Sequence, residues 1–191
     1  MLDADVLVAD HIAHQGASAF WQDSVHLARQ LDAKATYLKH LRKEYTTTLF
    51  APERWGAKHC LATNQFAKAA KWYKKTHKKA VQAEREFSTV LAGYKEVAAW
   101  LAPYLAAKEK ITPLFPGNIS SPKSIWIREA RHAFLMGPVK AMRESKTMIE
   151  NAEKTHKKLK DLIEKTETQH QVAAFFKQAN KNKPGNHLAA S

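Results

Sequence analysis

Three Glu-x-x-His pairs in the second half of the sequence carry side chains that could bind a metal ion. They are Glu129–His132, Glu153–His156 and Glu167–His170. The spacing places a carboxylate and an imidazole on one face of a helix, as in helical bundles that bind two iron ions. Such a site needs the motif on two facing helices and further glutamates. All three pairs fall in one predicted helix, so we expect no metal site from them.

Two other groupings could bind metal or act in nucleophilic catalysis. His11 and His14 are spaced for one helix face, but two imidazoles without a third ligand are a weak zinc pattern. Cys60 follows His59 directly, and adjacent residues on a helix point about 100° apart, which does not suit thiolate activation. We therefore expect no metal, no cofactor and no catalytic residue, and we expect Cys60 to be a buried small residue.

One pair of residues has the spacing of a ribonuclease motif. Arg54 and His59 enclose four residues, which faintly resembles the Arg-x4–6-His motif of the all-helical HEPN-type ribonucleases. Trp55 follows the arginine where that family usually has a polar residue, and the pair falls in a predicted loop rather than in a helix. The resemblance covers two residues and implies a ribonuclease only as a third alternative.

The strongest chemical pattern is a run of basic residues with no acidic residue between Glu53 and Glu84. The stripe 68, 71, 75 and 78 is offset by about 200° from the apolar positions of the same helix, so it faces away from the core. Lysines neutralise phosphates, and an aromatic side chain among them can stack on bases. The predicted interface is Lys68, Lys71, Trp72, Lys74, Lys75, Lys78, Lys79, Arg85, Arg128, Arg131, Lys157 and Lys158.

Two readings of this pattern stay open. The lysines could form an ordinary solvated helix face, and Trp72 could lie at a contact between helices.

The sequence Lys-Thr-His-Lys-Lys occurs at 75–79 and again at 154–158. If the chain turns near residue 116, the residue numbers of two positions that lie side by side add up to about 232. The two copies would then lie side by side and merge into one basic patch. The copies differ in their phase relative to the apolar positions, with His77 on these positions and His156 beside them.

The composition bounds the kind of protein. The chain has 191 residues, a net charge of +13 and one cysteine, which excludes an intramolecular disulfide framework and fits a reducing compartment. The acidic start lacks the basic region of a signal peptide. The longest uncharged apolar run, 97–107, is about half a membrane span. We expect a protein of the cytoplasm, nucleoid or virion, without transmembrane insertion.

The apolar spacing predicts an all-α protein. Between residues 66 and 105 the apolar positions alternate steps of four and three without a slip, the pattern of a heptad seam. We expect a single elongated domain over 1–179, with two long helices forming an antiparallel coiled-coil hairpin and shorter helices packed alongside. The expected helices are 4–14, 18–48, 58–109 and 122–179, with loops at 50–57 and 111–121, a kink at Gly137–Pro138 and a basic tail at 180–191.

These patterns favour a non-enzymatic structural protein that binds DNA or RNA largely independently of sequence. We expect it to be a repeated subunit of a nucleoprotein assembly, and so a homo-oligomer or part of a larger complex. The alternative is a membrane-surface scaffold similar to curved BAR-like dimers, whose basic face binds anionic lipid. Acidic residues at the N-terminus argue against that alternative, because anionic lipid would repel them.

Overall fold

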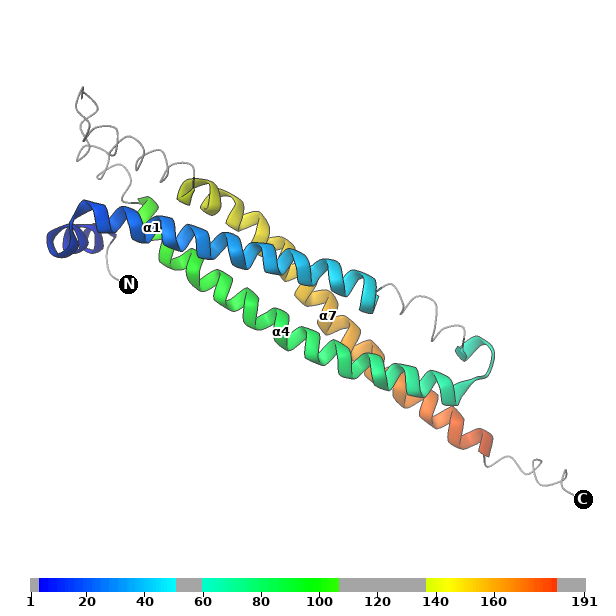
Figure 1. Cartoon of the computed structure of the whole chain (residues 1–191). Coiled ribbons are helices and arrows are strands. Elements are labelled where there is room, and N and C mark those ends of the chain that lie inside the picture. The colour runs from blue at the N-terminus through cyan, green and yellow to red at the C-terminus, as the bar shows by residue number, and fades with distance from the viewer. Residues whose placement is uncertain (1–3, 51–59, 107–136, 182–191) are drawn as a thin grey trace, which may run out of the picture. The chain divides into compact units, whose positions relative to one another are not determined.

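The computed structural model describes residues 4–50, 60–106 and 137–181, with side chains from residue 22 onward (Figure 1). Its elements are α1 (Ala4–Tyr45), the π-helical turn η1 (Thr46–Phe50), α4 (Phe66–Ala106) and α7 (Pro138–Lys181). No strand occurs among the described residues, so the all-α prediction is confirmed. None of the described helices contains an apolar stretch long enough to cross a membrane.

The chain divides into two compact units, which we describe separately. Unit 1 comprises Met1–Leu38 and Val90–Ala152, and unit 2 comprises Lys39–Thr89 and Glu153–Ser191. Segments of α1, α4 and α7 contribute to each unit. The expectation of one elongated domain stays a prediction.

The predicted apolar positions form the core of both units. Every seam position of α4 from 66 to 105 is buried or half-buried, and Phe87 and Leu101 are fully buried. The predicted positions of α7 from 141 to 173 are likewise buried or half-buried. Phe176 is the exception, because 44% of its surface is exposed. Periodic burial of one helix face is what stabilises helices of this length.

Unit 1 buries two tyrosines of α4. The ring of Tyr94 is buried. This burial is the larger cause, and the negative charges of Asp32 and Glu144 are the smaller ones, that raise the pKa of Tyr94 to about 12. Burial and then the charge of Asp23 also raise the pKa of Tyr104. These influences come from α1 and α7, so in unit 1 the α4 segment faces both other helices. Both phenols therefore stay protonated well into the alkaline range.

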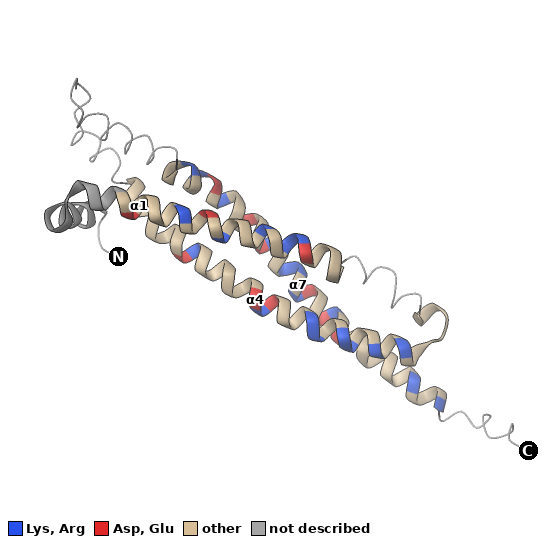
Figure 2. Cartoon of the chain, viewed as in Figure 1, with Lys and Arg blue, Asp and Glu red and all other residues tan. Residues whose placement is uncertain are grey.

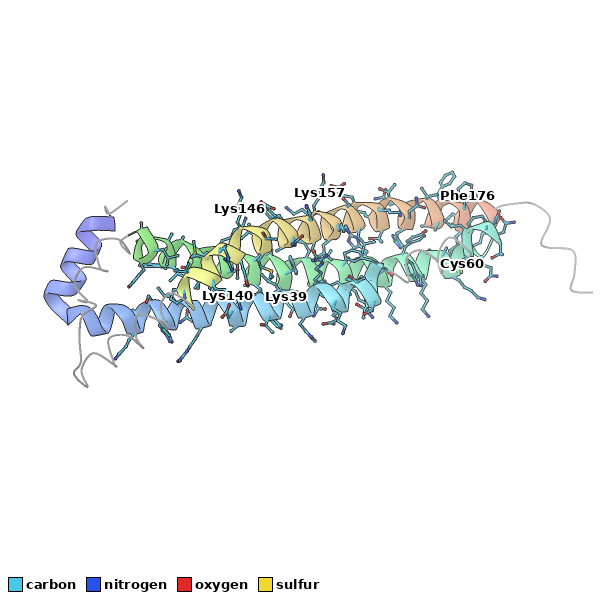
Figure 3. All side chains as sticks on the ribbon, turned by 90° about the horizontal axis from the view of Figure 1, so that it is seen from above. Lys39, Cys60, Lys140, Lys146, Lys157 and Phe176 are labelled. Carbon is cyan, nitrogen blue, oxygen red and sulfur yellow. The ribbon has the colours of Figure 1, made fainter. Side chains whose placement is uncertain are left out.

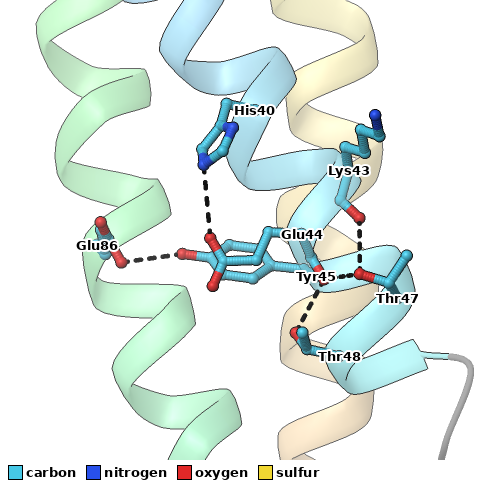
Figure 4. A network of polar contacts seen from close by, with 7 residues as sticks. All are labelled: His40, Lys43, Glu44, Tyr45, Thr47, Thr48 and Glu86. Carbon is cyan, nitrogen blue, oxygen red and sulfur yellow. Dashed lines mark hydrogen bonds and ion pairs between the residues drawn. The ribbon is translucent and has the colours of Figure 1, made fainter.

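In unit 2 the end of α1 is attached to α4 through Tyr45 (Figure 4). The buried Tyr45 ring packs at a tilt on Phe87, with centroids 6.3 Å apart, and its hydroxyl donates a hydrogen bond of 3.1 Å to Glu86. A buried ring with a polar tip can bind an apolar partner and a carboxylate together. Tyr45 thereby fixes which part of α4 lies beside α1.

Three threonines follow Tyr45 and occupy η1. The Thr46 hydroxyl donates to the carbonyl of Arg42 at 2.7 Å, and the hydroxyls of Thr47 and Thr48 each donate to the carbonyl of Glu44 at 2.8 Å. Such back-bonding to the preceding turn is typical of threonine in helices and often bends them. Here it accompanies the change from α-helical to π-helical hydrogen bonding.

Two predicted helix boundaries are wrong. α1 continues through Gly16, where we expected a break, because one glycine costs a helix only about 1 kcal/mol. The expected helix 58–109 is interrupted at 63–65, where Asn64 adopts a left-handed conformation with φ of 54°. The N–H of Gln65 donates to the carbonyl of Cys60 at 2.8 Å, which closes the preceding helical turn. Asparagine tolerates this conformation better than most residues, and it ends helices for that reason.

Other boundary predictions lie wholly or partly outside the described residues. These are the loops at 50–57 and 111–121, the helix start at 122 and the tail beyond 181. α4 contains Pro103 and continues to Ala106. α7 as described begins at Pro138, and the N–H of Ala141 donates to the carbonyl of Gly137 at 2.9 Å, which suits a proline in the first turn. The kink expected at Gly137–Pro138 stays a prediction.

Candidate nucleic-acid interface

Positive charge is concentrated in unit 2. Among the described residues, unit 2 has 17 lysines and arginines against 7 acidic residues, whereas unit 1 has 6 against 7. Figure 2 shows the basic residues following one another along the first half of α4. The excess of positive charge among the described residues therefore lies in unit 2, which is the candidate interface.

The described basic residues of the predicted interface are all exposed. They are Lys68, Lys71, Lys74, Lys75, Lys78, Lys79 and Arg85 on α4, and Lys157 and Lys158 on α7. Within the described residues, none of these nine side chains forms an ion pair with an acidic group. In Figure 3 the side chain of Lys157 points outward from α7. Arg128 and Arg131 lie outside the described residues.

Exposed like charges on one helix face repel one another and destabilise the helix by a few tenths of a kcal/mol per pair. The heptad seam of α4 compensates, because it buries Ala70, Tyr73 and Ala80 on the opposite side. The helix thus holds six lysines over residues 68–79 while its packing comes from other positions. An anion that binds this face would also relieve the repulsion.

Trp72 does not lie where the helical spacing placed it. Its ring is half-buried and packs, together with Cys60 and Leu61, against a cluster of Ala69, Ala70, Tyr73 and Ala173. It also meets the ring of Tyr73 edge-on, with centroids 5.4 Å apart. The residues before the Asn64 turn thus pack against the same cluster as Trp72. Trp72 is therefore a packing residue of unit 2, and the alternative reading of this residue as a helix contact is the better one.

Cys60 belongs to the same cluster. We expected it to be a buried small residue, and it is half-buried with a free thiol. His59 and Arg54 lie outside the described residues, so the expectation that rests on them stays untested.

The segments of α4 and α7 in unit 2 run antiparallel, and their register differs from the predicted one. His77 lies beside α7, with Nδ1 3.3 Å from the carbonyl oxygen of Ile163 and 3.4 Å from the hydroxyl of Thr166. Oε1 of Glu84 lies 2.7 Å from Nε2 of His156, within hydrogen-bond distance. The residue numbers of two of these pairs add up to 240 rather than to about 232. The histidines at 77 and 156 consequently do not face each other.

The two Lys-Thr-His-Lys-Lys copies occupy equivalent environments in this register. Thr76 and Thr155 are both buried, and His77 and His156 are both half-buried against the opposite helix. His77 contacts Ile163, which is seven places beyond His156, and His156 contacts Glu84, which is seven places beyond His77. His77 occupies a seam position and His156 lies beside one, and both are half-buried because α4 also buries Thr76 beside its seam. The lysines that follow each histidine are exposed at two levels of the α4–α7 pair.

The groups that the structure describes include no cluster of three or more potential metal ligands. His156, one member of a Glu-x-x-His pair, instead contacts Glu84 across the helix pair with both side chains about a quarter exposed. The side chains of His11, His14, Glu129 and His132 lie outside the described part.

Sequence reasoning missed an exposed aromatic group at the end of α7. Phe175 is 66% exposed, and Phe176, which we placed in the seam, stacks on Phe66 with centroids 5.2 Å apart while 44% of it stays exposed. Figure 3 shows Phe176 at the same end of unit 2 as Cys60. The signal available in the sequence was the adjacent pair Phe175–Phe176, because neighbouring residues on a helix point about 100° apart and both cannot lie in one narrow seam.

No protein-family model, no curated protein and no solved structure matches this chain. Unit 2 presents many cations that have no acidic partner among the described residues, together with a small group of exposed aromatic rings.

Proposed function

We propose that this chain is a non-enzymatic, structural nucleic-acid-binding protein whose unit 2 contacts the phosphate backbone. The observation that carries the proposal is the set of nine exposed basic side chains on α4 and α7 that have no acidic partner among the described residues. Cations of this kind displace the counterions condensed on a nucleic acid, and the released ions drive binding without regard to sequence.

The proposal includes the arrangement expected from the sequence, an antiparallel hairpin of the two long helices. Antiparallel contacts of α4 with α7, such as His77 with Ile163 and Glu84 with His156, support it. Helices that present cations at successive turns suit a rod-like polyanion, because several phosphates can be neutralised along one surface. We further propose that the protein acts as a repeated subunit, so that many copies cover one nucleic acid in the cytoplasm, nucleoid or virion.

The test is a titration of the purified protein against labelled duplex, labelled single strand and phosphatidylglycerol vesicles at several salt concentrations. The test variant carries Lys71→Gln, Lys75→Gln and Lys78→Gln. Each phosphate contact contributes about 0.9 to the slope of log affinity against log salt for duplex and about 0.7 for single strand. Loss of three contacts should therefore reduce the slope by about 2 to 3 and weaken binding to all sequences alike.

A matched control removes the same number of charges from unit 1. Lys140, Arg143 and Lys146 are all exposed on α7, and their replacement by Gln should leave the salt slope unchanged. Equal effects of the two triple variants would mean that only the total charge matters and that unit 2 is not the interface. Tight binding to the vesicles with little affinity for nucleic acid would replace the proposal by the membrane scaffold. Binding to neither would show that the charge serves a protein partner.

A further inference from the structure

Three of the four large apolar residues described as exposed in unit 2 gather at one end, where Val172, Phe175 and Phe176 are 39%, 66% and 44% exposed; the fourth, Val81, lies farther along α4. Residues 172, 175 and 176 are neighbours on a helix surface because they are three and four places apart. The ring of Phe175 meets that of Phe176 edge-on, with centroids 5.8 Å apart, and Phe176 stacks on Phe66 of α4. We call Phe66, Val172, Phe175 and Phe176 the aromatic end.

The aromatic end lies in the part of unit 2 that has no acidic residue. Neither 60–83 nor 168–181 contains Asp or Glu, and Glu164 and Glu167 lie on the preceding turns of α7. The two stretches are in contact, since Ala69, Ala70 and Tyr73 pack with Ala173. Together they carry eight lysines, which are Lys68, Lys71, Lys74, Lys75, Lys78, Lys79, Lys177 and Lys181.

Exposed aromatic rings surrounded by cations suit one kind of ligand better than others. A flexible polyanion with flat apolar groups places its phosphates on the lysines and its bases on the rings, and each stacked base adds to the affinity regardless of its identity. In a duplex the base faces are covered by their neighbours, and only base edges and phosphates are accessible to a protein. In a single strand the faces are free to stack on aromatic side chains.

We infer that the aromatic end binds single-stranded nucleic acid, with an unpaired base stacked on Phe175 while the surrounding lysines contact the phosphates. This inference rests on the proposed function and specifies its ligand. Phe175 is the ring that carries it, because it is the most exposed aromatic residue of the described chain and contacts Phe176 through an edge. Phe176 is less suited to this role, because its ring already stacks on Phe66 within the protein.

The experiment measures binding of labelled oligothymidylate of about 12 nucleotides, within the usual site size of a single-strand binding module. An abasic strand and a duplex of equal length serve as comparison ligands. The variants are Phe175→Ala, Phe175→Leu, which keeps apolar bulk but removes the ring, and Trp100→Ala. Trp100 is 62% exposed on the α4 segment of unit 1 and is therefore a matched aromatic control.

Both substitutions of Phe175 should weaken binding of oligothymidylate about 5- to 100-fold, the range expected for loss of one stacked base. Binding of the abasic strand and the duplex should change by less than about twofold, since phosphate contacts remain. Trp100→Ala should change none of the three affinities. Far-ultraviolet circular dichroism and urea midpoints of each variant equal to those of the unchanged protein show that folding is intact.

Several results would overturn the inference, and they separate it from the proposed function. If Phe175→Ala binds all three ligands like the unchanged protein while the Lys71/Lys75/Lys78 variant loses salt dependence, the phosphate interface stands and stacking is refuted. If Phe175→Ala weakens all three ligands equally, the ring does not contact bases. If it abolishes self-association in sedimentation, or binding to phosphatidylglycerol vesicles, the aromatic end is occupied by a second copy or by lipid. If the unchanged protein binds no nucleic acid, the proposed function and this inference fail together.

Discussion

Replacement of Gly93 by alanine is a sharp test of the packing in unit 1, because two opposing effects can be weighed. Gly93 lies half-buried inside α4, and glycine in a helix interior is less favourable than alanine by roughly 0.5–1 kcal/mol. A Cβ added there would lie 3.0 Å from Nζ of Lys34 and 3.7 Å from its Cε. Both atoms belong to the far end of a flexible side chain, and among the described residues outside this turn of α4 no backbone atom lies within 4 Å.

The ammonium group of Lys34 can move by a few tenths of an ångström through rotation of its last bonds. We therefore expect Gly93→Ala to raise the free energy of unfolding by about 0.5–1 kcal/mol. Urea denaturation followed by circular dichroism should show a higher midpoint with an unchanged slope. For a chain of this size the thermal midpoint should rise by about 1 to 4 °C.

A double-mutant cycle with Lys34→Ala identifies the source of any deviation. If the ammonium group obstructs the new methyl group, Gly93→Ala should stabilise the Lys34→Ala background by more than it stabilises the original chain. A fall in the free energy of unfolding that persists in the Lys34→Ala background would refute the reasoning. Such a result would place a backbone, rather than a mobile side chain, against Gly93.

Two further predictions concern the buried residues of α4. Since the pKa of Tyr94 is raised from 10.0 to about 12, the folded state holds a proton that the unfolded state loses between these pH values, so stability should fall as pH rises through that range. Urea midpoints of Tyr94→Phe should fall less steeply there, and an unchanged pH dependence would contradict the raised pKa. Ala80 is fully buried, and Ala80→Leu should cost about 1–3 kcal/mol by overpacking. The exposed Ala67→Leu should change the free energy of unfolding, measured by urea denaturation, by no more than about 0.5 kcal/mol, and equal effects of the two substitutions would show that the seam has room.

The helical class and most of the core could be predicted because both follow from local spacing. A heptad pattern over forty residues of α4 leaves one face to bury, whichever helix lies against it. The outward direction of Lys68, Lys71, Lys75 and Lys78 follows from the same geometry, and these residues are exposed. The predicted charged surface therefore needed no knowledge of tertiary contacts.

The features that were mispredicted depend on contacts between segments distant in sequence. Trp72 packs against a cluster that includes Ala173 of α7, and a helical wheel of α4 contains no information on that contact. The register of α4 against α7 is set by contacts such as Phe66 with Phe176, while our prediction assumed a turn near residue 116. The exposure of Phe175 also depends on where the neighbouring helix ends.

The alanine-rich core restricts how this chain can change during evolution. Fully buried alanines at 69, 80 and 173 leave no volume for larger side chains, so substitutions there are limited by size. Polarity is a weaker restriction, since Ser145 and Thr166 are buried in α7 with their hydroxyls bonded to carbonyls of the preceding turn at 2.7 and 2.8 Å. Divergent copies of this protein should therefore keep small residues at heptad spacing while their hydrophobicity drifts, and a search weighted by side-chain volume would find them more readily than one weighted by hydropathy.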